Sequence, residues 1–261
     1  MRKFWIGAGV VAALTLVGCG GGGEEKKAEA PKADSAAAPA GGAGTPDEAN
    51  GGTITGKVNF EGTKPTMKNL DMSATPFCTR AHAGGAPSEE VVINGNGTVK
   101  NAFVWVKSGL PDKQWTTATA PIELDQQGCM YKPHMVVLQV GQPLKIKNND
   151  ETLHNIHPRP AVNAEFNIGQ PRKGMESTKT FDKKEVMIPV GCDVHPWMRS
   201  YISVLDNPFY AVTDEDGKFE IKGLPAGEYE IEAVHEKLKS QTGKITVKDG
   251  EKATLDLSYK G

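Results

Sequence analysis

Residues 135–149, MVVLQVGQPLKIKNN, contain the pattern that decides the fold. The run 135–140 is almost continuously apolar, and in the run 143–148 Leu144 and Ile146 alternate with lysines. Side chains of a β-strand point alternately to its two faces, so the second run predicts a strand with one buried face. The Gly-Gln-Pro sequence between the runs indicates a turn.

The same pattern recurs outward in both directions. Clusters of Asn, Gly, Pro and Asp separate the runs, and no stretch has the period of a long amphipathic helix. Regularly spaced short strands of this kind predict an all-β fold, built as a sandwich or a barrel. The further strand-like runs are residues 53–60, 101–106, 178–181, 185–188 and 200–204.

The C-terminal residues have a strand pattern of their own. Residues 213–233, TDEDGKFEIKGLPAGEYEIEA, contain an Asp-Gly turn between two alternating runs. This sequence resembles the carboxypeptidase regulatory-like family, which implies a small transthyretin-like β-sandwich over residues 206–261. Residues 51–62, GGTITGKVNFEG, resemble the first strand of that family.

Two domain arrangements are therefore open. In the first, residues 53–110 and 206–261 share one sandwich, and a second domain is inserted between them. In the second, residues 53–205 and 206–261 form two domains in tandem.

The N-terminal residues predict export and lipid attachment. Two basic residues precede an apolar run, residues 6–17, that is too short to span a bilayer. The run ends in Leu-Val-Gly-Cys at Cys19, which resembles the lipobox of bacterial lipoproteins. The resemblance implies a signal peptide over residues 1–18 and acylation of Cys19. We therefore expect a cell-envelope protein, lipid-anchored to a membrane and facing the periplasm or the cell exterior, and Gly20 favours the outer membrane.

Residues 19–52 predict a disordered tether. They are rich in Gly, Ala, Pro and Ser and almost lack β-branched and aromatic side chains. Such a segment cannot bury enough apolar surface to offset the entropy lost on ordering. We expect it to hold a folded body away from the membrane.

The charge of the chain argues against a nucleic-acid partner. Removal of the signal peptide takes away two of the 30 Lys and Arg, which leaves 28 against 32 Asp and Glu, or a net charge of −4. This charge is weak and the sequence has no basic stripe, whereas nucleic-acid binding needs one.

One short segment combines three metal-binding side chains. Cys192, His195 and Met198 have the spacing Cys-x2-His-x2-Met between two predicted strands. Thiolate and thioether are soft ligands, imidazole suits copper, and a His2Cys set with a weak axial Met is the blue copper arrangement. The fourth ligand should be a second histidine. His154, which follows a strand and an Asn-Asn-Asp turn, is the best candidate.

With this ligand pattern, residues 131–205 resemble the cupredoxins, the blue copper proteins of the amicyanin and plastocyanin type. The matching pattern is a strand, an N-x-D turn, a His followed by a polar residue, and a distant loop containing HPWMR. The resemblance implies a Greek-key β-sandwich that binds one type 1 copper ion. It gives Asn155 a hydrogen bond near the Cys192 sulfur that ties the two ligand loops together. It assigns the equatorial positions to His154, Cys192 and His195 and the axial position to Met198.

The position of His195 on a loop predicts how electrons enter and leave. We expect the edge of its ring to face solvent and to serve as the electron port. Pro158, Pro196 and Trp197 would form an apolar patch around it, which suits brief docking of redox partners.

The cysteine count predicts one disulfide. The chain has four cysteines. If Cys19 is lipidated and Cys192 binds metal, Cys78 and Cys129 remain. An exported chain folds in an oxidising compartment, where such an even remainder usually forms a disulfide. We therefore predict a Cys78–Cys129 bond.

The remaining histidines have less defined roles. We interpret His157 as a polar neighbour of the centre, although its spacing from His154 allows a supporting role or substitution as a ligand. His134 follows the predicted disulfide cysteine Cys129 closely, and positions near to and remote from the metal are both open. His82 and His235 are interpreted as surface or packing residues.

These features together predict a one-electron carrier rather than an enzyme. The loop has one cysteine, whereas a binuclear copper site needs two, and the chain has no His-x-His pairs of the multicopper oxidases and no haem-binding or nucleophile motif. The expected partners are redox proteins of a respiratory or oxidative chain. The alternative is a non-redox copper-binding or structural lipoprotein whose regulatory-like sandwich mediates assembly.

Overall fold

Residues 135–149 form two strands with the expected burial. In β6 (Leu144–Asn148), Leu144 and Ile146 are fully buried, whereas Lys145 and Lys147, which alternate with them, are half-buried and form ion pairs. The preceding strand, β5 (Met135–Gln139), is buried along its whole length. Its two faces contact different hydrophobic clusters, because Val136 and Leu138 belong to one cluster and Met135 to another.

The computed structural model describes residues 45–261, which contain one short helix, α1 (Pro76–Ala81), and seventeen strands. The prediction of an all-β fold is confirmed. The predicted signal peptide, the lipidation residue Cys19 and the predicted tether up to residue 44 lie outside the described residues. The last residues of the predicted tether are ordered, which corrects its end: the N–H of Asp47 donates to the carbonyl of Gly223 at 3.2 Å, and Gly52 begins the first strand. The remaining strands are β1 (Gly52–Glu61), β2 (Phe103–Ser108), β3 (Ile122–Gln126), β4 (Tyr131–Lys132), β7 (His154–Pro158), β8 (Ile168–Gln170), β9 (Met175–Lys179), β10 (Glu185–Gly191), β11 (Arg199–Leu205), β12 (Tyr210–Val212), β13 (Lys218–Leu224), β14 (Gly227–Val234), β15 (Gln241–Val247), β16 (Lys252–Thr254) and β17 (Leu257–Lys260).

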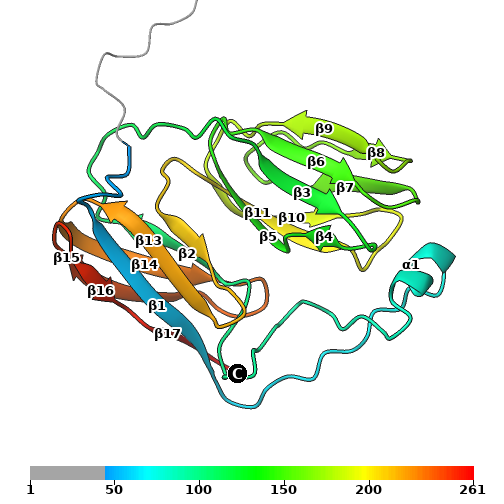
Figure 1. Cartoon of the computed structure of the whole chain (residues 1–261), viewed down its shortest axis with the longest axis horizontal. Coiled ribbons are helices and arrows are strands. Elements are labelled where there is room, and N and C mark those ends of the chain that lie inside the picture. The colour runs from blue at the N-terminus through cyan, green and yellow to red at the C-terminus, as the bar shows by residue number, and fades with distance from the viewer. Residues whose placement is uncertain (1–44) are drawn as a thin grey trace, which may run out of the picture. The chain divides into compact units, whose positions relative to one another are not determined.

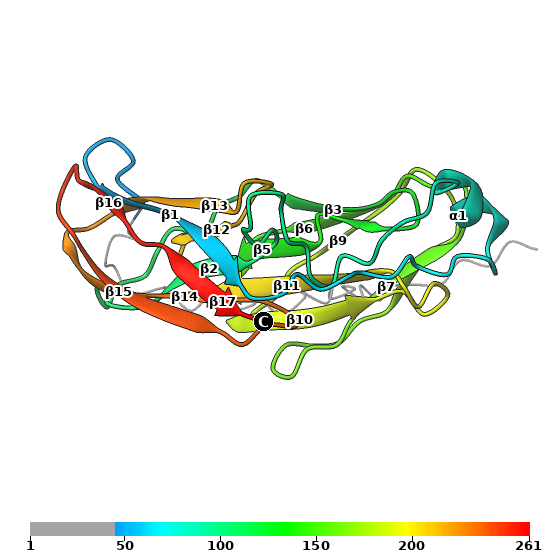
Figure 2. The same ribbon diagram turned by 90° about the horizontal axis from the view of Figure 1, so that it is seen from below.

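The first sandwich is built from both ends of the described chain. One sheet has the order β13-β1-β16, with β17 also paired to β1, and the other has the order β12-β2-β14-β15. Figure 2 shows β1 and β13 in one layer and β14 and β15 in the other. Residues of both sheets form its core, among them Ile54, Val104, Phe219 and Ile231.

The sequence left two domain arrangements open. The strand pairing follows the first of them, in which the two ends of the chain share one sandwich and other strands are inserted between them. β1 pairs with the C-terminal strands β13, β16 and β17, and β2 pairs with β12 and β14. Strands β3 to β11 therefore lie in the chain between the two halves of the first sandwich (Figure 1).

Strands β3 to β11 form the second sandwich. One sheet has the order β5-β11-β10-β7-β8 and the other the order β4-β3-β6-β9. The consecutive strands β5 and β6 thus lie in opposite sheets rather than in a hairpin. The chain crosses between the sheets at Gly141, whose φ of 78° favours glycine because other residues are strained there.

The chain between β1 and β2 contributes to the second sandwich as well. We call residues 70–86, which include α1, the α1 segment; its hydrophobic side chains pack into the core of that sandwich. Cys78 in α1 is bonded to Cys129 between β3 and β4, with an S–S distance of 2.06 Å. The predicted disulfide is confirmed. Within residues 45–261, no helix is long and apolar enough to cross a membrane.

Candidate metal centre

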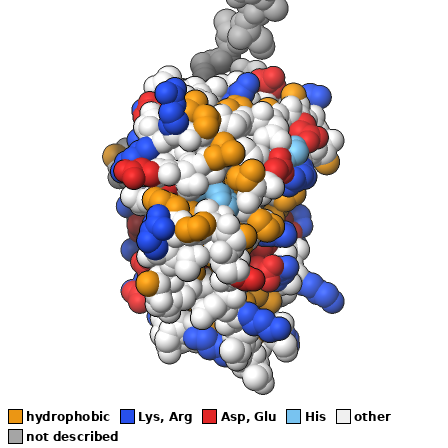
Figure 3. All heavy atoms as spheres, turned by 90° about the vertical axis from the view of Figure 1, so that its right-hand side faces the viewer, with side chains coloured by type: hydrophobic (Ala, Val, Ile, Leu, Met, Phe, Trp, Pro, Cys, Tyr) orange, Lys and Arg blue, Asp and Glu red, His pale blue; other side chains and the backbone are white. Residues whose placement is uncertain are grey.

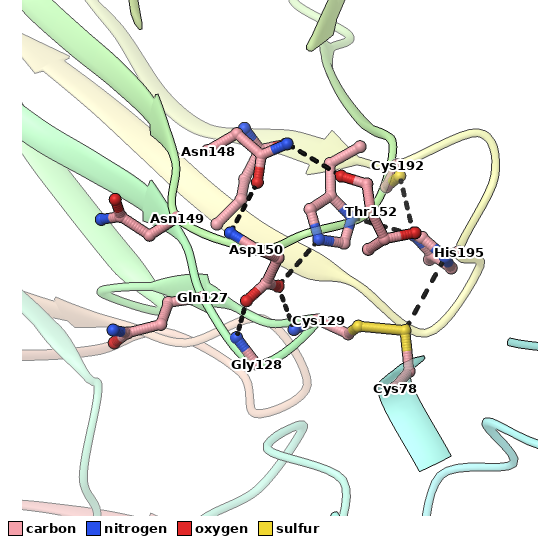
Figure 4. Close-up of polar contacts among 12 residues, drawn as sticks. Cys78, Gln127, Gly128, Cys129, Asn148, Asn149, Asp150, Thr152, Cys192 and His195 are labelled. Carbon is pink, nitrogen blue, oxygen red and sulfur yellow. Dashed lines mark hydrogen bonds and ion pairs between the residues drawn. A yellow bond between two sulfur atoms is a disulfide. The ribbon is translucent and has the colours of Figure 1, made fainter. Parts of the chain in front are cut away.

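Hydrogen bonding between β7 and β10 brings the predicted ligands together. His154 begins β7, and Cys192 directly follows β10. The two strands pair antiparallel, with Val190 opposite Pro158 and Gly191 opposite His157. The sheet therefore places residues about forty positions apart in the sequence at one end of the second sandwich (Figure 4).

The ligand atoms of three residues converge on one point. His154 Nδ1 lies 2.9 Å from His195 Nδ1, which lies 3.7 Å from Cys192 Sγ. The three side chains are buried, and their ligand atoms all lie within 4.8 Å of one another. Nitrogen and sulfur atoms at these separations could both bind one ion at the usual distances of about 2.0–2.1 Å to nitrogen and about 2.3 Å to sulfur. The donor set therefore fits a metal ion.

Met198 closes the loop on its inner side. Its N–H donates to the carbonyl of His195 at 2.9 Å, and its carbonyl accepts from the N–H of Cys192 at 3.3 Å. The Met198 side chain is fully buried in the same hydrophobic cluster as Cys192. All four residues assigned from the sequence thus lie at this end of the second sandwich.

Asn155 links the two segments that contribute ligands. Its backbone N–H points to Cys192 Sγ at 3.5 Å, and its side-chain oxygen lies 3.2 Å from the same sulfur. That oxygen also accepts from the N–H of Asp193 at 2.7 Å, and its Nδ2 donates to the Asp193 carboxylate. The contact that the resemblance implied for Asn155 is therefore present, together with an additional bond to Asp193.

Asp150 is a site residue for which the sequence analysis gave no role. Its carboxylate lies 2.8 Å from His154 Nε2 and accepts hydrogen bonds from the N–H groups of Gly128 and Cys129. It thereby leaves Nδ1 of His154 to face the centre, as a carboxylate commonly does for a metal-binding histidine. The only sequence signal is the four-residue spacing between Asp150 and His154.

Electrostatics favour the charged forms of this pair. Burial opposes ionisation of His154, but hydrogen bonds to Asp150 and Cys192 outweigh it and raise the pKa of the imidazole. Burial also opposes ionisation of Asp150, but the bonds from His154 and two backbone N–H groups lower the pKa of the carboxyl. Asp150 is therefore an anion at neutral pH, and its carboxylate, as a charged hydrogen-bond acceptor, orients the ring of His154.

The thiol of Cys192 is expected to ionise near pH 6 in the metal-free protein. Burial works against the thiolate, but hydrogen bonds from the imidazoles of His154 and His195 and from backbone N–H groups lower the pKa from 9.0 to about 6. The thiolate absorbance in the ultraviolet should therefore rise as the pH passes about 6. Because the folded-state pKa lies below the ordinary one, folding should also lose stability as the pH falls from about 9 to about 6. Cys192→Ser is the blank for the titration, and a thiolate that forms only near pH 9 would contradict this prediction.

The expectation that the His195 ring faces solvent is wrong. His195 is only 3% exposed, because the disulfide and Trp197 cover it. Cys78 Sγ lies 3.8 Å from His195 Nε2 (Figure 4). Trp197 Nε1 donates to the carbonyl of Cys129 at 3.1 Å. Of the predicted apolar patch, Pro196 is exposed and Trp197 is half-buried, whereas Pro158 is buried within β7 and does not contribute. The sequence contained no signal that residues far upstream would cover this ring.

The other histidines lie outside the ligand group. His157 contacts the carboxylates of Asp193 and Glu165, so it is a neighbour of the loop. His134 contacts Glu236, which is remote in the sequence. The ring of His82 contacts the carbonyl of Gly128 at 2.6 Å. Burial lowers the pKa of His235 to about 4, so this buried residue is neutral.

The exposed side of this end of the molecule is partly apolar. Leu153 and Val194, each next to a predicted ligand, are 42% and 48% exposed. The face on the side of α1 and β8 carries hydrophobic side chains among charged side chains of both signs (Figure 3).

Comparison with known proteins gives a family match for one part of the chain. Residues 201–260 match the model of the carboxypeptidase regulatory-like domain. No curated protein sequence matches the chain.

Among solved structures, the chain is similar to copper proteins over little more than a third of its length. A Cu(I) structure of an amicyanin variant matches at 22% identity, over 39% of this chain and 97% of that chain, with a TM-score of 0.29. An oxidised amicyanin variant matches at 20% identity over the same shares, with a TM-score of 0.30. A copper-containing nitrite reductase from Thermus scotoductus matches at 18% identity and a TM-score of 0.29, over 37% of this chain and 25% of the reductase. The match thus spans about a quarter of the reductase's length.

Proposed function

We propose that this chain binds one copper ion as a type 1 centre and carries single electrons between redox proteins outside the cytoplasm. The observation that carries the proposal is the convergence of two imidazole nitrogens and one cysteine sulfur in a buried group. Imidazole and sulfur ligands of this kind suit copper, and a buried thioether completes the set. The proposed ligands are His154, Cys192, His195 and Met198.

The surroundings of the ligands suit electron transfer because they hold the ligand positions. Asp150 fixes the ring of His154, the backbone N–H of Asn155 donates to the Cys192 sulfur, and the disulfide packs against His195. A geometry that is tolerable to both Cu(I) and Cu(II) needs little rearrangement when an electron moves. Burial of the three side chains also keeps water away from the ion.

We propose that partners dock on the exposed side of the ligand loop. Val194 and Pro196 flank the covered His195 and are exposed, so they offer a short path to the ion. A small, partly apolar contact suits brief redox encounters. The proposed lipid on Cys19 and the tether would raise the effective concentration near membrane-bound partners. In this proposal the chain is a carrier and not an enzyme.

The first test is the visible spectrum of the copper-loaded chain. Cu(II) added to the purified protein should give an intense thiolate-to-copper band, and Cys192→Ser should abolish it because the thiolate is the source of the transition. His157→Gln is the matched control, since His157 lies outside the ligand group, and it should keep the band. Absence of the band from the parent protein, or a band that remains in the Cys192→Ser variant, would contradict the proposal.

A second candidate is a structural or assembly role with a bound, inactive copper ion. The match of residues 201–260 to the regulatory-like domain favours it. Voltammetry of the copper-loaded chain separates the two functions. Rapid, reversible cycling supports the carrier, whereas an ion that binds but does not cycle supports the assembly role.

A further inference from the structure

A further histidine, whose side chain is largely buried, lies among carboxylates outside the proposed copper centre. His134, immediately before β5, places Nε2 2.5 Å from Glu236 Oε1, in the connection between β14 and β15. The two side chains are 9% and 3% exposed. The carbonyl of His134 accepts hydrogen bonds from Tyr201 N and Ser200 Oγ, both at 3.0 Å, so its backbone is held in place.

This pair leaves buried polar atoms unsatisfied. Among the described residues, His134 Nδ1 and Glu236 Oε2 are buried without a hydrogen-bond partner. Glu89 Oε2 lies 3.8 Å from Nδ1, which is too far for a hydrogen bond. A buried polar atom without a partner is unfavourable, so we expect Nδ1 to have a bonding partner that the protein itself does not supply.

A small cavity is lined in part by His134. It has a volume of about 60 Å³, and Glu89, Met130 and His134 are among the side chains that line it. Arg199 also lines it, and Glu90 in its wall is paired with Lys237. Since one water takes about 30 Å³ in the liquid, the cavity has room for an ion with a water ligand.

The arrangement matches the way in which carboxylates prepare a histidine for a metal ion. Glu236 accepts a hydrogen bond from Nε2–H, which leaves the lone pair of Nδ1 free to bind an ion. Glu89 can supply a carboxylate oxygen from the exposed side. Imidazole with a carboxylate suits Zn²⁺ and Cu²⁺ better than Mg²⁺ or Ca²⁺, which prefer oxygen ligands throughout.

We propose that His134 Nδ1 and the Glu89 carboxylate bind a second divalent transition ion, Zn²⁺ or Cu²⁺, and that Glu236 is its positioning residue. This site is independent of the Cys192 centre and of the electron-carrier function. Its ligands come from the α1–β2 connection and from the second sandwich, and its positioning residue follows β14 of the first sandwich.

The test uses Zn²⁺ as the probe on chain already loaded with one equivalent of copper. Equilibrium dialysis followed by elemental analysis should find one zinc besides the copper. Glu89→Gln and His134→Gln should each weaken zinc binding by about tenfold or more. Both should leave the visible spectrum of the Cys192 centre unchanged. The Cys192→Ser chain should still bind the zinc, so the two proposals can fail separately.

Glu165→Gln is the matched control because Glu165 and His157 form a second His–Glu contact of 2.5 Å, but at an exposed position. It should leave the affinity for zinc unchanged. Absence of a second ion, or zinc binding that Glu89→Gln does not weaken, would overturn the proposal and leave His134 and Glu236 as an ion pair without a metal. Glu89 is partly exposed, so this variant decides the question even if His134→Gln does not fold.

Discussion

The double variant Cys78→Ser/Cys129→Ser should unfold with a free energy about 4 kcal/mol below that of the parent chain. The disulfide closes a loop of 51 residues. Cross-linking a loop of this length lowers the conformational entropy of the unfolded chain, and this loss corresponds to about 4 kcal/mol of stability at 25 °C. Denaturant unfolding of both proteins in the metal-free state measures the difference. Ser73→Ala, an exposed position in the α1 segment, is the control and should change the unfolding midpoint little.

The same variant should release copper faster than the parent chain. Cys78 Sγ contacts the ring of His195, and the disulfide holds the α1 segment over that ligand. Without the bond, the α1 segment can open and admit water and chelators to His195. The rate at which a chelator bleaches the visible band measures this effect. Equal bleaching rates for the two proteins, together with equal stability, would show that the disulfide is not part of the cover.

Asp150→Asn should have the second large effect, on both folding and metal affinity. The carboxylate accepts bonds from His154 Nε2 and from two backbone N–H groups, and it is almost fully buried. An asparagine must turn its amide NH2 toward one of these donors, and it cannot balance a charged His154. Removing one partner of a buried pair costs about 3–5 kcal/mol. Loss of the carboxylate that orients a metal-binding histidine lowers metal affinity about 10–100-fold.

Denaturant unfolding and competition with a copper chelator measure these two losses. Asp182→Asn is the matched control, because Asp182 is exposed. It should change neither quantity. An Asp150→Asn chain with parental copper affinity would show that Asp150 does not position His154.

The candidate site was predictable from the sequence where its residues are close in the chain. Cys192, His195 and Met198 lie on one loop, so their spacing alone indicates a common ligand set. His154 was predictable because it follows a strand and a turn that resemble a known family. Asp150 was not assigned, because an aspartate in an Asn-Asn-Asp turn has an ordinary local role and only the fold turns its carboxylate toward His154 Nε2.

By itself, the sequence predicted most of the β-strands, though not β3, β7 or β8, together with the disulfide pair and the proposed metal ligands, because periodicity, residue type and cysteine number are local or countable properties. The tertiary structure decided that β5 and β6 belong to opposite sheets and that β1 and β2 join the C-terminal strands. It also decided that Cys78 covers His195 and that His134 meets Glu236. Each of these contacts joins positions far apart in the chain. They form because the apolar face of each strand must be buried against another element, and the sequence of a single segment does not say which element that is.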